Sequence, residues 1–201
     1  MLDGWAKTRI DPLLEVVAAR VADRGISANQ VTVASWAIGL AAATAIALEW
    51  FWVGLALFLL NRMGDGLDGA IARLKGSTAF GGYLDIVLDF AVYGAVPLGF
   101  ILADPGANAL AGAVLVVSFY VNGASFLAFS AVAARLGMET RVRGPKSIYF
   151  TTGLAEGTET ILFFILFCLF PQWFAPLALA FAAMCFWTAF WRVLEARRLI
   201  R

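Results

Sequence analysis

The sequence contains no histidine, and this absence removes several kinds of chemistry. Without an imidazole, the chain has no histidine general base and no histidine ligand for zinc. Cysteine is nearly as scarce, because the only two are Cys168 and Cys185. Both lie in apolar runs without the spacing of a CxxC motif, so we expect neither a disulfide nor a zinc site. Any acid-base chemistry must therefore come from other side chains.

Charged residues are also few, at 14% of 201 residues, whereas 62% of the residues are hydrophobic. The mean hydropathy is +0.83, which lies well outside the range of an ordinary soluble domain. The sequence has no internal repeat and no low-complexity tract. These features predict an integral membrane protein that works in membrane lipid, and we expect no nucleic-acid partner.

Residues 1–24 lack the uninterrupted apolar core of a signal peptide or a spanning helix. Asp11, Pro12 and Glu15 form a helix-start signature. Apolar residues then follow on one helical stripe, namely Leu13, Leu14, Val17 and Val21. We therefore predict an amphipathic juxtamembrane helix over 1–24 that lies on the membrane surface, followed by a transmembrane catalytic domain over 25–201.

A spanning helix needs about 20 predominantly apolar residues. Six stretches of the chain meet this requirement: 30–49, 51–73, 80–103, 108–136, 147–170 and 173–195. The predicted fold class is therefore an all-α membrane protein with six transmembrane helices and a preceding interfacial helix.

Basic residues are concentrated on alternate sides of these predicted spans. The turns at 49–52, 104–108 and 170–173 contain no lysine or arginine, whereas both termini and the other loops hold nearly every basic residue. By the positive-inside rule, the termini and those loops are cytoplasmic. We expect a bacterial cytoplasmic membrane protein whose second and third spans meet at its cytoplasmic face. Arg62 lies outside this pattern.

Four aspartates lie within the second and third predicted spans, namely Asp65, Asp68, Asp85 and Asp89. A charged side chain at the centre of a bilayer costs roughly 2.5 to 3.5 kcal/mol, so these carboxylates need a partner. Intervals of three and four residues place each pair on one helix face. Oxygen ligands without histidine or cysteine favour Mg²⁺, Mn²⁺ or Ca²⁺. Alternatively, the aspartates form structural ion pairs with Arg62, Arg73 and Lys75.

The same segment carries a specific motif, Asp65-Gly66-Leu67-Asp68-Gly69-Ala70-Ile71-Ala72-Arg73, followed after seven residues by Gly81, Asp85 and Asp89. Every fixed position of the signature of the CDP-alcohol phosphotransferase family, the class I CDP-alcohol phosphatidyltransferases, is present, and the whole chain resembles that family. Within it, the chain is most similar to a group of proteobacterial inner-membrane proteins. That closer similarity extends over 85–97 and 146–162 and does not identify a substrate.

The resemblance implies a metal-dependent transfer of a phosphatidyl group from CDP-diacylglycerol to a small alcohol, with release of CMP, in phospholipid biosynthesis. The four aspartates would bind one or two Mg²⁺ or Mn²⁺ ions, and Asp89 would also act as the general base. Nucleotide contacts are implied for Asn29, Thr32, Gly69, Arg73, Thr78 and Gly81. The family usually has proline where this chain has Ala28, which we expect to loosen the helix start. The resemblance also implies a homodimer.

The acceptor alcohol is not identified by the sequence. Related enzymes bind phosphorylated acceptors with basic residues near this cavity, and the candidates here are Arg141, Arg143 and Lys146. Alternatively, this basic run is attracted to anionic lipid. Glu156 and Glu159 could accept hydrogen bonds from a polyol or an amino alcohol, or pair with Arg62 or Arg192.

Two other functions use similar residues. An intramembrane prenyltransferase also binds a diphosphate through metal ions, and Asn61-x3-Asp65-x2-Asp68 with Asp85-x3-Asp89 superficially resembles its two motifs. A cation transporter would use buried carboxylates as a transit site, but it would place acids across the full membrane depth, commonly within inverted repeats.

Overall fold

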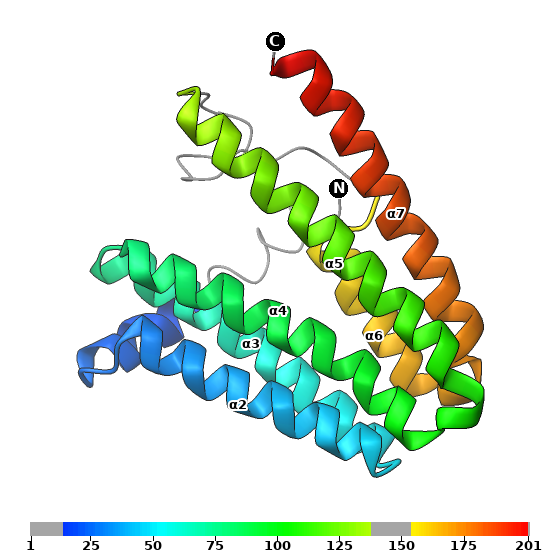
Figure 1. The fold of residues 1–201 in the computed structure, drawn as a ribbon. Coiled ribbons are helices and arrows are strands. Elements are labelled where there is room, and N and C mark those ends of the chain that lie inside the picture. The colour runs from blue at the N-terminus through cyan, green and yellow to red at the C-terminus, as the bar shows by residue number, and fades with distance from the viewer. Residues whose placement is uncertain (1–13, 138–153, 201) are drawn as a thin grey trace.

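The computed structural model describes residues 14–137 and 154–200, and every regular element in these ranges is helical (Figure 1). Residues 14–23 form a helical segment. The elements that follow are α2 (Ala28–Ala47), α3 (Phe51–Lys75), α4 (Ala79–Ala103), α5 (Pro105–Arg135), α6 (Gly157–Leu169), the short 3₁₀ helix η1 (Pro171–Trp173) and α7 (Phe174–Leu199). The predicted all-α class is confirmed for the described residues.

Four helical segments in the described ranges are long and apolar enough to cross a membrane: α2, α4, α5 and Pro171–Leu199. Helix α3 has 25 residues, but the half that the predicted topology places near the cytoplasm is rich in charged side chains. These are Arg62, Asp65, Asp68, Arg73 and Lys75. Helix α6 is apolar but has only 13 residues. The arrangement with six spans therefore stays a prediction.

The helices form two groups that meet along α4 and α5 (Figure 1). In the first group α2 packs against both α3 and α4, and in the second α5 packs along α7. Glycine allows close approach within the first group, because a Cβ atom at Gly99 would lie 2.6 Å from the carbonyl oxygen of Ala43. Small residues at such crossings are typical of membrane helix packing.

Phenylalanine side chains form the core in which the two groups meet. Phe100 stacks on Phe174 with ring centroids 4.7 Å apart, and Phe58 contacts Phe164 at 5.3 Å. All four side chains are at most 1% exposed. Phe58 lies in the first half of α3, which follows α2, and Phe100 lies near the end of α4, which precedes α5. This apolar packing holds α3 and α4 together at one end. The aspartates lie in the other halves of these two helices.

The helical segment over 14–23 packs on the last turns of α3. Ala18 and Ala22 are buried against Ala70 and Ile71, and Lys75 Nζ donates a hydrogen bond of 2.6 Å to the Ala22 carbonyl oxygen. The predicted stripe included Val17, but this side chain is 37% exposed, because the small alanines form the packed face. Residues 1–13 lie outside the described residues.

Helix α6 begins ten residues after the predicted start of the fifth span. Its N-cap is Glu156, whose backbone N–H donates to Glu159 Oε2 at 3.2 Å. The preceding turn is fixed by Thr188 Oγ1, which accepts hydrogen bonds from the N–H groups of Leu154 and Ala155. A capping box of this kind satisfies backbone donors at a helix start, so the two glutamates begin α6 here.

Candidate metal and substrate site

Two helix starts and one tight turn assemble the candidate site. Gly76, with φ of +96°, ends α3, and Thr78 caps α4 by accepting a hydrogen bond of 3.0 Å from the N–H of Gly81. A left-handed φ favours glycine, which has no Cβ atom to clash. The turn brings the end of α3 and the start of α4 together. Their polar faces therefore meet beside the start of α2.

Helix α2 begins at Ala28. Ser27 and Gln30 form a capping box: Gln30 N donates to Ser27 Oγ at 3.3 Å, and Ser27 N donates to Gln30 Oε1 at 2.9 Å. The capping box satisfies backbone donors at this helix start, and the expected loosening at Ala28 stays a prediction.

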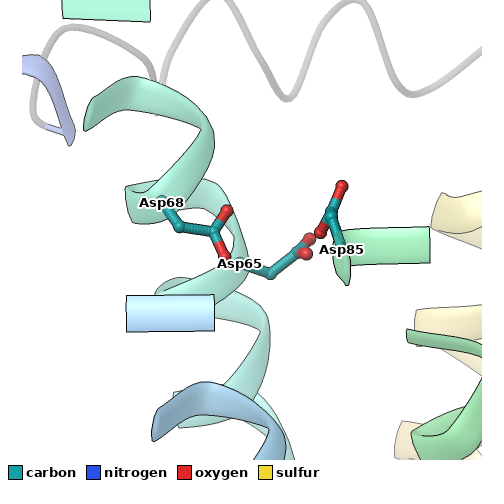
Figure 2. Close-up of side chains that lie close together, drawn as sticks. All are labelled: Asp65, Asp68 and Asp85. Carbon is teal, nitrogen blue, oxygen red and sulfur yellow. The ribbon is translucent and has the colours of Figure 1, made fainter. Parts of the chain in front are cut away.

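Three aspartates meet between α3 and α4. Each of Asp65, Asp68 and Asp85 offers a carboxylate oxygen, and these three oxygens lie within 4.8 Å of one another. Figure 2 shows Asp65 on α3 and Asp85 on α4 extending towards each other, with Asp68 beside them on α3. Acidic oxygens at this spacing are suitable ligands for a hard divalent cation.

The burial of Asp68 provides an independent test of whether a cation fits. Asp68 is only 5% exposed, and its Oδ2 atom has no hydrogen-bond partner among the described residues. It lines a cavity of about 10 Å³ together with Asp65, Asp85 and Asp89. A cavity of roughly 10 to 15 Å³ accommodates one water-sized occupant. An unsatisfied buried carboxylate oxygen beside a cavity of this size fits a bound Mg²⁺ or Mn²⁺ ion.

Asp89 lines the same cavity but is bound differently from the other three aspartates. Its Oδ1 atom accepts a hydrogen bond of 2.8 Å from Arg62 Nη2. The Arg62 side chain is 8% exposed, and its Nη1 atom lies 3.8 Å from Asp65 Oδ2. The metal-site and ion-pair interpretations therefore overlap at Asp65, and Asp89 forms the shorter of the two ion pairs of Arg62. The structure brings three of the predicted ligands together and pairs the fourth with arginine.

Arg62 is the residue of this site whose role the sequence left open. Asn61 Oδ1 accepts from Arg62 Nε at 2.8 Å, and Asn61 Nδ2 donates to the Ser35 carbonyl oxygen on α2 at 2.7 Å. Tyr93 on α4 accepts from Arg62 Nη1 at 3.1 Å. The sequence offers two signals for Arg62: its place outside the positive-inside pattern, and the alternative that it forms ion pairs with the aspartates.

A larger groove of about 720 Å³ adjoins the small cavity, and Thr32, Asp68 and Asp85 line both. Five of the six predicted nucleotide contacts line the groove: Asn29, Thr32, Gly69, Thr78 and Gly81. Arg73 lies beside it, since its Nη1 atom would be 3.6 Å from a Cβ atom added at Gly69. The predicted residues thus surround one space next to the three carboxylates, where a substrate could contact both.

The predicted acceptor-binding residues do not come together in one site among the described residues. Arg141, Arg143 and Lys146 lie outside the described residues. Glu156 lines a second cavity of about 360 Å³ between α4, α5, α6 and α7, together with Tyr93 and Arg192. Glu159 accepts the capping hydrogen bond at the start of α6. Among the described residues, the salt bridges of Arg62 are to Asp65 and Asp89 and not to either glutamate.

Arg192 on α7 is held by α5. Its Nη1 atom donates to the backbone and side-chain oxygens of Asn122, both at 3.0 Å, and to Ser125 Oγ at 2.7 Å. These interhelical contacts explain why Asn122 and Ser125 are polar within an apolar helix. Arg192 is 7% exposed, so the contacts also satisfy a buried cation.

Comparison with known proteins gives two kinds of similarity. The family model described as CDP-alcohol phosphatidyltransferase matches residues 26–191. The inner membrane protein YnjF of Escherichia coli (strain K12) is 50% identical over 194 residues, which cover 96% of this chain and 94% of that protein.

Solved structures of the Mycobacterium tuberculosis phosphatidylinositol phosphate synthase PgsA1 have a similar fold. The structure with CDP-DAG bound has a TM-score of 0.74 at 19% identity and covers 92% of this chain and 94% of that one. The complex with manganese and citrate has a TM-score of 0.75 at 19% identity and covers 92% and 88%.

Proposed function

The chain belongs to the CDP-alcohol phosphatidyltransferase family and is an enzyme of that class, and we propose that it transfers a phosphatidyl group from CDP-diacylglycerol to a small alcohol. The observation that carries the proposal is Asp68, which has an unpartnered Oδ2 atom and lines both a cation-sized cavity and a groove of substrate size. Family membership favours this reaction over prenyl transfer or cation transport.

Asp65, Asp68 and Asp85 are the proposed ligands of Mg²⁺ or Mn²⁺, and the role of Asp89 as a fourth ligand stays a prediction. A divalent cation bound there would neutralise negative charge on the substrate diphosphate. It would also stabilise the attacking and leaving oxygens of the reaction. The manganese complex of PgsA1 supports this cofactor, and its complex with CDP-DAG supports the CDP-lipid.

The proposed reaction is a displacement at the phosphorus atom that carries the diacylglycerol. The acceptor hydroxyl oxygen forms a new bond to this phosphorus, the bond between it and the oxygen of CMP breaks, and CMP leaves. Asp89 receives the hydroxyl proton, because a positioned carboxylate is a suitable general base and the chain has no histidine. Arg62 occupies Asp89 Oδ1, so Oδ2 is the proposed proton acceptor.

The residues around the groove would hold the CDP group. Gly69 and Gly81 present no side chain to the substrate, and Asn29, Thr32 and Thr78 offer hydrogen-bonding groups. Arg73 beside the groove would contribute a positive charge towards the diphosphate. Glu156 in the second cavity is a proposed contact for the acceptor alcohol.

We place the enzyme in the bacterial inner membrane, as the name of YnjF supports, with its site and both termini on the cytoplasmic side. Six spans, an interfacial helix over 1–24 and a homodimer complete this proposal. The large apolar surface of α4, α5 and α7 suits lipid or a second copy of the chain.

Purified protein in detergent provides the test. CMP release from CDP-diacylglycerol should require Mg²⁺ or Mn²⁺ together with an alcohol from a panel that includes glycerol phosphate, serine, inositol, inositol phosphate, choline and ethanolamine. Asp85→Asn should abolish release, whereas Asp104→Asn, the same change at the α5 N-cap, should retain it. Turnover that survives exhaustive chelation would refute the metal assignment.

A further inference from the structure

Among the described residues, two buried side-chain polar atoms have no hydrogen-bond partner, and both belong to residues that line the small cavity beside the aspartates. They are Asp68 Oδ2 and the indole Nε1 atom of Trp36 on α2. Buried polar groups are nearly always paired, so each of these atoms indicates something that the cavity holds. The proposed cation accounts for Asp68, but it leaves Trp36 without a partner.

The surroundings of Trp36 indicate where a partner for Nε1 lies. The Trp36 side chain packs against the apolar core, whose side chains offer no hydrogen-bond acceptor. Nε1 is buried, so solvent does not reach it. Trp36 lines the small cavity but neither the groove nor the second cavity. An acceptor for Nε1 therefore comes from whatever occupies the small cavity.

Helix α2 leads from the groove to the small cavity. Asn29 lines the groove, Thr32 lines both spaces, and Trp36, about one turn further along, lines the cavity. A CDP group held in the groove would therefore direct its phosphates towards the cavity. Asp89, the proposed base, lines the cavity and not the groove. The phosphorus atom under attack must lie near this base, so the phosphate that carries the diacylglycerol lies on the side of Trp36.

An indole N–H donates a hydrogen bond but cannot accept one, so its partner must carry a lone pair. A cation has none to offer, whereas an oxygen of the substrate phosphate does. During the displacement, negative charge is spread over the nonbridging oxygens of the transferred phosphate. A donor that the fold already holds in place stabilises such charge without any reorganisation.

We propose that Trp36 is a catalytic residue that donates its indole N–H to a nonbridging oxygen of the transferred phosphate. This inference rests on the proposed function, which supplies the CDP-lipid and the role of Asp89 as base.

The first test follows the indole N–H groups by NMR in protein that carries ¹⁵N-labelled tryptophan. The Trp36 cross-peak, assigned by its absence from Trp36→Phe, should move downfield when CDP is added with Mg²⁺, because a hydrogen bond to an anionic oxygen deshields the proton. CMP with Mg²⁺ should leave the peak in place, since CMP lacks the phosphate that is transferred. Three tryptophans that are at least 60% exposed serve as internal controls: Trp50, Trp52 and Trp173.

The other outcomes of the NMR test count against the proposal. A shift with Mg²⁺ alone would assign the bond to a water ligand of the cation, and a shift with CMP would assign it to the leaving phosphate. CDP that binds without moving the Trp36 peak would overturn this inference alone. Wild type that does not bind CDP with Mg²⁺ would overturn the proposed function as well. Where Trp36→Phe does not fold, replacing the other tryptophans one at a time assigns the same peak.

The second test compares the activity of Trp36→Phe with that of the wild type. We expect kcat for CMP release to fall about 100-fold, a usual cost of removing one donor to the charge of a transition state. KM for CDP-diacylglycerol should change much less, because the bond is strongest in the transition state. The affinity for CMP should stay the same. An unchanged kcat in folded Trp36→Phe would refute the catalytic role.

Two control variants separate loss of the donor from loss of packing. Val96→Ala removes apolar volume from α4 at a side chain that is 1% exposed, so it should lower thermal stability without lowering kcat. Trp52→Phe makes the same change as Trp36→Phe at a residue that is 71% exposed, and it should leave stability and kcat close to wild type. Losses of kcat that are equal in Trp36→Phe and Val96→Ala would show that packing, and not the N–H group, determines the rate.

Discussion

Replacing Asp68 by asparagine should stabilise the metal-free protein and remove its response to metal. With an effective dielectric constant of about 20, two unit charges at the 4.8 Å limit of this cluster repel by about 3.5 kcal/mol. Solvent screens the half-buried Asp65 and Asp85, so we expect a net gain of about 1 to 3 kcal/mol from neutralising Asp68. For a chain of this size, that gain raises Tm by about 3 to 10 °C.

The wild type should show the opposite behaviour when metal is added. Mn²⁺ at about 100 times its Kd stabilises the folded state by about 2.7 kcal/mol, whereas Asp68→Asn should gain little. The order of the two Tm values should therefore reverse between chelator and saturating Mn²⁺. Both cysteines are buried, so a thiol-reactive dye reports unfolding in detergent.

A matched control replaces an aspartate outside the cluster. Asp104 caps α5 by accepting a hydrogen bond of 3.0 Å from the N–H of Ala107. Asparagine is an equally good N-cap, so Asp104→Asn should leave both Tm and the metal response close to wild type. If Asp68→Asn instead destabilised the metal-free protein and kept the Mn²⁺ response, Asp68 would belong to a structural ion pair and our reasoning would fail.

Three further predictions concern the groove and the helix packing. Gly69→Val should raise KM for CDP-diacylglycerol about tenfold with Tm nearly unchanged, and an unchanged KM would place the substrate elsewhere. Gly99→Val should lower stability by about 1 to 3 kcal/mol, because its Cβ would lie 2.6 Å from a carbonyl oxygen of α2. Gly94→Ala on the same helix should not lower it, and equal losses would contradict this packing. Ser27→Ala should cost about 0.5 to 2 kcal/mol in thermal unfolding, and no loss would show that the capping box is dispensable.

Much of the helical arrangement could be predicted from the sequence. Helices α3 and α4 begin and end within two residues of the predicted spans, because long apolar runs and the turn around Gly76 leave few alternatives. The start of α6 could not be predicted in this way. The predicted span over 147–170 places Glu156 and Glu159 inside a membrane helix, whereas the capping hydrogen bond places them at the beginning of α6. Hydropathy identifies an apolar run, but it does not show at which polar residue within that run the helix begins.

The site could be predicted as far as helix geometry determines it. Intervals of three and four residues placed Asp65 and Asp68 on one face of α3 and Asp85 on the facing side of α4, and the structure confirms this meeting. Arg62 is one of the ion-pair partners that the sequence offers for the aspartates, but which aspartates it contacts could not be predicted. Its long side chain reaches Asp89, which is 27 residues away in the sequence, and such a contact depends on how two helices pack.

The net charge of the aspartate cluster also determines an order of binding. Arg62 brings a single positive charge to the four carboxylates, through its salt bridges to Asp65 and Asp89, so the metal-free cluster keeps a net negative charge. This charge would repel a diphosphate in the adjoining groove, which Asp68 and Asp85 also line. A divalent cation removes most of this repulsion, whereas Arg62 cannot do so because its charge is already paired with Asp89. Metal should therefore bind before the CDP-lipid, and the affinity for the lipid should depend on metal even where no acceptor is present and no chemistry follows.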